Sequence, residues 1–193
     1  MSANNLILGV TAVTIAAMSF AQNDTIPNAP KQDQPGAVVT DKVGHVRASW
    51  PPPWIMDKVY RTVYGEARGQ GDAEVAAIVH VIVNRWQKRF RGAQTLHDVV
   101  LHCDPYRERC QFSVWNLHDP NVRVITNPSV DKCKRYREIV DIVNTIVQGR
   151  MAGTIPDPTR GGDHYWHGPN TPYWAKGQAV LKIEHVNIIN LKG

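Results

Sequence analysis

Cysteine pairs, basic runs and long apolar stretches are scarce in this sequence. Three cysteines occur among 193 residues and none forms a Cys-x-x-Cys pair, which argues against a structural zinc site. No five Lys or Arg residues follow one another, and no DNA- or RNA-binding signature is present. Nucleic acid is therefore not expected as the ligand, although a net charge of +5 suits a polyanionic partner.

The odd number of cysteines allows at most one internal disulfide. Cys103 and Cys110 are spaced to close a short loop in an oxidising compartment, which would leave Cys133 as a free thiol. Three reduced thiols are an equally open interpretation.

One apolar run stands at the start of the chain, in residues 6–21. It is short for a membrane span, which needs about 20 residues, and it resembles the apolar part of a signal peptide. No basic residue precedes it, since the first is Lys31, which is unusual for a signal peptide. Residues 1–21 are therefore interpreted as a signal peptide, an anchor or a docking peg, with contact to a membrane or a virion assembly through residues 6–21.

The rest of the chain divides into a linker and a domain. Residues 22–53 are rich in Pro, Asp, Gln and Asn without any period, which is typical of a linker. Residues 54–193 show helical spacing of apolar residues first and short alternating stretches later. We expect one mostly helical α+β domain with a small β-sheet.

Apolar spacing and capping residues place the elements of this domain. The predicted elements are a helix from Trp54 into Glu66, a helix capped by Asp72 and buried on most sides, a short helix from Thr95 to Val100, a long helix capped by Ser129 and ended by Gly149 and Gly153, and strands within 183–191.

Glu66 is the first candidate for chemistry. It lies between two apolar helices in the segment Tyr64-Gly65-Glu66-Ala67-Arg68-Gly69, where a carboxyl group is poorly solvated. Poor solvation raises the pKa of a carboxyl group, as a glycosidic general acid requires. The competing interpretation is a surface glutamate paired with Arg68.

Five segments in order carry a family resemblance. They are Tyr64 to Gly69, Val83-Asn84-Arg85, Gln111 to Trp115, Pro156 to His167, and Pro172 to Lys176 with His185 beyond. This order resembles the SleB-like cell wall hydrolase family across about residues 54–190. The chain departs from the family pattern at Gln70, at Asp163 and at His185-Val186-Asn187.

The resemblance implies a lysozyme-like fold, related to lytic transglycosylases, and cleavage of the β-1,4 bond between N-acetylmuramic acid and N-acetylglucosamine. It implies that Glu66 is the catalytic acid. Neither a metal nor another cofactor is expected.

Aromatic and polar residues of the later segments are candidate ligands for glycan strands, because aromatic faces stack on sugars and polar groups bind hydroxyls and acetamides. The candidates are Gln111, Ser113, Trp115, Asp163, His164, Tyr165, His167, Tyr173 and Trp174. Trp166 is a further aromatic residue of these segments. The competing interpretation is that half of the aromatic residues belong to the core. For Gln111 and Ser113, the competing interpretation is that they cap a turn. His80 and His97 are interpreted as surface or boundary histidines.

The reaction type depends on a second carboxylate, which a hydrolase needs and a lytic transglycosylase does not. Glu74 is expected to face outward, Asp157 to be structural, and Asp163 is the remaining candidate. We therefore expect a transglycosylase, with a two-carboxylate muramidase as the alternative.

Other classes of function remain open at this point. They are a metal-dependent peptidase or amidase built on His164 and His167, a non-catalytic virion or envelope protein, and a nucleophilic hydrolase, for which no Gly-x-Ser-x-Gly element is present. Action at the cell wall is expected, in the periplasm or outside the cell, from an exported enzyme or a phage lysin carried in a virion.

Overall fold

A computed structural model describes residues 39–40, 46–47, 50–104 and 109–191. The chain divides into residues 1–35 and residues 36–193, and all described residues lie in the second unit. The predicted apolar segment 1–21 and most of the predicted linker lie outside the described residues. Two short strands, β1 (Val39–Thr40) and β2 (Val46–Arg47), pair antiparallel within the expected linker.

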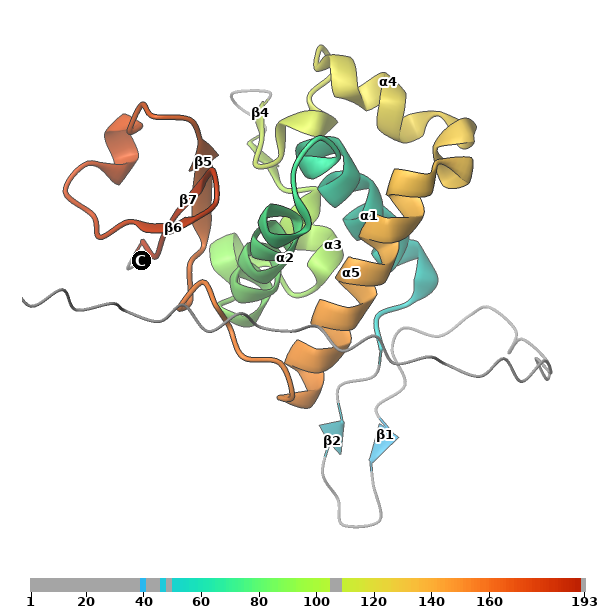
Figure 1. Ribbon diagram of the computed structural model, residues 1–193. Helices are drawn as coiled ribbons and strands as arrows, with labels where there is room; N and C mark the ends of the chain where they lie inside the picture. The colour runs from blue at the N-terminus through green and yellow to red at the C-terminus, as the bar shows by residue number, and fades with distance from the viewer. Residues whose placement is uncertain (1–38, 41–45, 48–49, 105–108, 192–193) are drawn as a thin grey trace, which may run out of the picture. The chain divides into compact units, whose positions relative to one another are not determined.

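The domain is mostly helical, with small antiparallel sheets, as the sequence predicts (Figure 1). The α-helices are α1 (Pro53–Ala67), α2 (Asp72–Gln87), α3 (Leu96–Val100), α4 (Pro120–Thr126) and α5 (Lys134–Ala152). The 3₁₀ turns are η1 (Phe90–Gly92), η2 (Ser113–Trp115), η3 (Pro128–Lys132) and η4 (Tyr173–Ala175). The strands are β3 (Cys103–Asp104), β4 (Arg109–Cys110), β5 (His164–His167), β6 (Leu181–Ile183) and β7 (Val186–Ile189).

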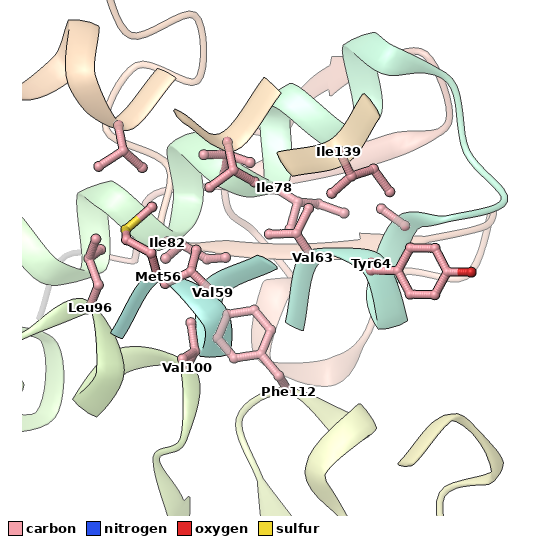
Figure 2. Packing of buried hydrophobic residues seen from close by; sticks show 14 of the residues in the cluster. Met56, Val59, Val63, Tyr64, Ile78, Ile82, Leu96, Val100, Phe112 and Ile139 are labelled. Carbon is pink, nitrogen blue, oxygen red and sulfur yellow. The ribbon is translucent and has the colours of Figure 1, made fainter. Parts of the chain in front are cut away.

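Apolar packing between α1, α2, α3 and α5 forms the main core (Figure 2). Val59 and Val63 of α1 meet Ile78 and Ile82 of α2, and all four side chains are fully buried. The pattern that predicted α2 to be buried on most sides is confirmed, since eleven of its residues are buried. No helix in the described part of the chain is long and apolar enough to span a membrane.

The three-stranded sheet has the order β5-β7-β6, with every pair antiparallel. Val186 and Ile188 of β7 pack on Ala77 and Val81 of α2, which forms a second, smaller apolar cluster. We call β5, β6, β7 and the connection between β5 and β6 the C-terminal lobe. In Figure 1 it lies at one side of the helices, shown in red.

Helix ends agree with the sequence prediction in some places and not in others. Thr95 caps α3 as predicted, because its side chain accepts from the Asp98 amide and Asp98 accepts from Thr95 in return. The predicted cap at Ser129 is wrong, since Ser129 lies within η3 and Cys133 precedes the first residue of α5. Gly153 ends α5 in a left-handed conformation, as C-terminal glycines do.

Gly149 does not end α5 but lies inside it. A Cβ atom there would lie 2.4 Å from the side chain of Ile155, so the following loop packs against the bare backbone at this position.

A disulfide joins Cys103 and Cys110, which face each other across β3 and β4, and Cys133 is a free thiol. The pairing that the sequence left open is therefore the one that closes a short loop.

Candidate active site

Glu66 lies in the last turn of α1, directly against η2. The preceding residue, Gly65, makes this approach feasible, because a Cβ atom there would lie 2.8 Å from Val114. With no side chain at Gly65, η2 packs onto the helix and presents its backbone to the Glu66 carboxyl group.

Two donors reach the two oxygens of Glu66. The Val114 amide donates to Oε1 at 3.4 Å, and the Tyr165 hydroxyl donates to Oε2 at 2.9 Å. The Tyr165 contact joins residues 99 positions apart and connects α1 to β5 of the C-terminal lobe. Glu66 is thus held between the helical part of the domain and the sheet.

Burial raises the pKa of Glu66 above its ordinary value, and burial is the largest of the effects on it. The hydrogen bonds from Tyr165 and Val114 oppose this, because they stabilise the carboxylate. The negative charge of Asp119 raises the pKa further, and His167 lowers it. Burial therefore favours a protonated acid, and the two donors stabilise the ion that remains after the proton leaves.

The competing interpretation of Glu66 as a surface residue paired with Arg68 is wrong. Arg68 donates instead to the Gly65 carbonyl at 3.2 Å and to the Asn121 side chain at 2.7 Å. Arg68 therefore ties the end of α1 to α4.

Tyr165 is held as a neutral donor. Burial raises its pKa well above 10, and the adjacent Glu66 carboxylate acts in the same direction. Its ring also lies edge-on to His167, with ring centroids 6.0 Å apart. Alternate residues of a strand share a face, so Tyr165 and His167 project toward the same side of β5.

Arg85 is a buried cation that interacts electrostatically with Tyr165 and Glu66. Its guanidinium group is 5.2 Å from the ring centroids of both Phe90 and Phe112, and its Nε donates to the Asp163 carbonyl at 2.6 Å. Arg85 is 4% exposed, and its Nη1 has no hydrogen-bond partner among the described residues. A buried cation of this kind fixes the start of β5 to the end of α2.

Asn84 anchors the loop that leads into β5. Its side-chain amide lies 2.9 Å from the side chains of Asp157 and Thr159 and from the Gly162 carbonyl. Asp157 in turn accepts from the Thr159 and Gly161 amides, so its carboxylate shapes the loop. The prediction that Asp157 is structural agrees with these contacts, and Asn84 and Arg85 of the second motif act together to position the lobe.

Asp163 is 2% exposed, and three donors meet its carboxylate. Lys88 donates at 2.6 Å, the Leu191 amide at 3.0 Å, and the His164 Nδ1 lies at 2.7 Å. These contacts lower the pKa of Asp163 to about 2. The carboxylate is therefore already committed within the protein, and a direct role in substrate binding stays a prediction.

The other predicted ligands lie in different surroundings. On the face of β5 opposite to Tyr165, Trp174 packs between His164 and Trp166, with centroid distances of 5.6 and 5.7 Å. Tyr173 beside it is 82% exposed. The sequence named these aromatics as candidate glycan ligands without assigning them to a face, and the strand alternation places Tyr165 on one face of β5 and the Trp174 cluster on the other.

Three predicted ligands lie on or beside η2. The Trp115 indole donates to Thr62 of α1 at 2.8 Å, and Lys58 lies 5.2 Å from the ring centroid. Ser113, directly before Val114, is exposed. Gln111, three residues before Val114, is half-buried. Both are therefore near the Glu66 site in sequence, and their part in binding stays a prediction.

Two sequence interpretations are wrong because tertiary packing covers the residues concerned. Glu74 does not face outward: it is 1% exposed and accepts from the His185 amide at 2.8 Å. His80 is 3% exposed rather than on the surface, 3.6 Å from Asp157, and burial lowers its pKa to about 4.

Within the described residues, one grouping offers three potential metal ligands: Glu74, Glu184 and His185. It does not contain His164 or His167. Residues three apart in a strand project to opposite faces, which separates these two histidines and argues against a metal centre built on them.

The chain belongs to the Cell Wall Hydrolase family, whose model matches residues 69–187, more than half of the chain. The predicted SleB-like membership is confirmed, and the protein is an enzyme acting on peptidoglycan. The match begins three residues after Glu66, so the assignment of Glu66 rests on the motif and on the geometry described above. Neither the curated proteins nor the solved structures include a match to the chain.

Proposed function

We propose that this enzyme cleaves the β-1,4 bond between N-acetylmuramic acid and N-acetylglucosamine, with Glu66 as general acid. The observation that carries the proposal is the part-buried carboxyl group of Glu66 between the Val114 amide and the Tyr165 hydroxyl. The family supports peptidoglycan as the substrate, and a raised pKa supports a proton donor. A lysozyme-like ancestry of the fold is part of this proposal.

The proposed route is a lytic transglycosylation. Glu66 gives its proton to the glycosidic oxygen, and the bond from that oxygen to C1 of the muramic sugar breaks. The acetamido group stabilises the positive centre at C1. The Glu66 carboxylate then takes the proton of the C6 hydroxyl while O6 bonds to C1, which closes a 1,6-anhydro ring, consumes no water and restores the acid.

The commitment of other carboxylates supports a single-carboxylate mechanism. A hydrolase needs a second carboxylate that is free to activate water or to bond the sugar. Glu74 accepts from the His185 amide, Asp157 holds its own loop, and Asp163 is paired with Lys88. The three candidates that the sequence offered thus have structural roles.

Asp119 is the candidate that sequence reasoning missed. Its negative charge raises the pKa of Glu66, and its side chain also caps α4 by accepting from the Asn121 amide at 2.8 Å. In the sequence, Asp119 stands just before a helix that begins with proline, which predicts a helix cap. Nothing in that pattern indicates that Asp119 lies near Glu66. A two-carboxylate muramidase using Glu66 and Asp119 is the second candidate function.

Replacement of the acid tests the main proposal. Glu66→Gln keeps the shape and removes the proton, so turnover of purified peptidoglycan should fall by a factor of about 100 or more, with folding retained. Glu138→Gln on α5 is the matched control and should retain full activity. Near-normal turnover by a folded Glu66→Gln enzyme would show that Glu66 is not the acid.

Digestion in heavy-oxygen water separates the two candidate functions. A lyase releases 1,6-anhydro-muramic ends without label, whereas a muramidase releases labelled reducing ends. Asp119→Asn should retain most of the activity in the first case and lose it in the second. Labelled ends together with an inactive Asp119→Asn enzyme would establish the muramidase.

We further propose that the enzyme acts at the cell wall, in the periplasm or outside the cell. The Cys103–Cys110 disulfide supports a site of action beyond the reducing cytoplasm. Delivery by a phage virion, through residues 6–21, belongs to the same proposal.

A metal-dependent peptidase is the function that competes with the proposed glycosidase. Activity that survives exhaustive chelation would exclude that peptidase, and activity lost to chelation and restored by zinc would support it.

A further inference from the structure

A hollow of about 590 Å³ lies where the end of α2 meets η1 and the start of β5. Its lining includes Lys88, Arg89, Phe90 and Arg91, which are consecutive, and His164. Three cationic side chains on four consecutive residues therefore surround one concave surface.

The hollow carries positive charge that the residues described by the structure do not neutralise. Asp163, the carboxylate in the lining, is paired with Lys88 at 2.6 Å and with His164 at 2.7 Å. The exposed side chains of Arg89 and Arg91 make no hydrogen bond or ion pair with any described residue. Two guanidinium groups thus remain available to an anion.

The backbone holds these two arginines in an unusual conformation. Arg89 and Arg91 have φ values of 50° and 53°, in the left-handed region that residues other than glycine rarely adopt. Such a conformation persists only where the surroundings impose it. The turn therefore holds the backbone of both arginines at the rim of the hollow, with Phe90 between them.

The hollow is linked to the Glu66 site through Arg85. Arg85 stacks on Phe90 of the lining and shares electrostatic interactions with Arg91, Tyr165 and Glu66. His164 in the wall lies on the face of β5 opposite to Tyr165. In peptidoglycan, the peptide stem leaves the muramic sugar beside the bond that we propose is cut. Two or three extended residues of a stem span about 7–11 Å, so stem carboxylates extend well beyond the bond that is cut.

We infer that this hollow binds carboxylates of the peptide stems and makes the enzyme prefer stem-bearing glycan. The inference rests on the proposed function, because it needs peptidoglycan in the cleft. Guanidinium groups suit it chemically, since they donate two parallel hydrogen bonds to one carboxylate.

Binding to sacculi that carry no phosphate polymer tests the inference without cleavage. The full chain with Glu66→Gln is sedimented with untreated sacculi and with sacculi whose stem carboxyls have been converted to neutral methylamides. Adding Arg89→Asn and Arg91→Asn should weaken binding to untreated sacculi by about three- to tenfold, as loss of two exposed ion pairs predicts. Methylamidation should weaken the parent by a similar factor and leave the double variant unchanged.

Matched variants separate charge from folding. Asn tolerates a left-handed conformation, so the double variant should unfold at the temperature of its parent. Replacement of both arginines by Lys should retain most of the binding, and Arg137→Asn, on the exposed side of α5, should change it little.

Two results would overturn the inference. Equal affinity of the double variant and its parent for untreated sacculi would show that the hollow binds no stem. A loss that appears only with sacculi bearing a phosphate polymer would assign the hollow to phosphate instead. Cleavage of methylamidated sacculi by the unmodified enzyme is measured separately, so failure of the proposed glycosidase activity is distinguishable from failure of the hollow to bind stems.

Discussion

Buried apolar side chains hold the long helices together, whereas the C-terminal lobe has a small apolar cluster and depends on polar contacts. The helical core brings together residues of α1, α2, α3 and α5, while the lobe contributes Val186 and Ile188 to its own cluster. Around the lobe, the contacts of Asn84, Asp157 and Asp163 fix the loop and the strand. The helical core is stabilised by apolar surface removed from water, and the C-terminal lobe by specific hydrogen bonds and ion pairs.

This difference matters because the candidate site takes one side from each region. Glu66 comes from the helical core and Tyr165 from the lobe. A change that loosens the lobe should therefore damage the site even where the helices stay folded. The following predictions test that division, from the largest expected effect to the smallest.

Truncation in the helical core should destabilise the whole domain. Ile139 of α5 is fully buried, so Ile139→Ala should lower the free energy of unfolding by about 2–5 kcal/mol. Leu117→Ala is the control, because Leu117 is 82% exposed and its loss should change the free energy by less than about 0.5 kcal/mol. Denaturant unfolding measures both, and equal effects would show that α5 is not part of the core.

Loss of the Asn84 side chain should act on the lobe before the helices. Asn84→Ala removes one donor from each of Asp157, Thr159 and the Gly162 carbonyl, at a cost of about 1–3 kcal/mol. Amide hydrogen exchange should accelerate in β5 and β7 more than in α5. Asn170→Ala, at an exposed position in the lobe, should leave exchange unchanged, and uniform acceleration after Asn84→Ala would contradict separate stabilisation of the lobe.

Acid should weaken the lobe through Asp163. Its folded-state pKa of about 2 lies below the unfolded value of about 3.9, so its contribution is present above pH 4 and is lost as the pH falls toward 2. The contribution amounts to about 2–3 kcal/mol. Asp163→Asn should be less stable at neutral pH and should show a shallower loss of stability between pH 4 and 2. Parallel acid-unfolding curves for the two proteins would assign that loss to other groups.

Removal of the Tyr165 hydroxyl should shift the pH dependence of activity. The hydroxyl lowers the pKa of Glu66 by stabilising the carboxylate, so Tyr165→Phe should raise that pKa. Activity that is lost as Glu66 deprotonates should then persist to higher pH. Asp119→Asn should move the same limb to lower pH, because the charge of Asp119 raises the pKa of Glu66. Shifts of the same sign in both variants would contradict this account of the site.

Local patterns predicted the elements that local physics controls. The apolar spacing of α1 and α2 and the reciprocal contacts of Thr95 and Asp98 depend on residues close together in the chain. The start of α5 was misplaced, because Asn127 with Pro128 resembles a helix start whereas Cys133 offers no capping side chain, and only packing decides that the former begins a short 3₁₀ turn.

The sequence by itself determined the helical class of the domain, the order of its motifs and the position of Glu66 in an apolar, glycine-flanked segment. Tertiary structure alone decided which partners meet Glu66, since Tyr165 lies 99 residues away and Val114 contributes a backbone amide that no side-chain motif encodes. It also decided that Glu74 is buried instead of exposed. The physical reason is that burial and hydrogen-bond partners depend on where distant segments pack, whereas helix formation depends on neighbours within a few residues.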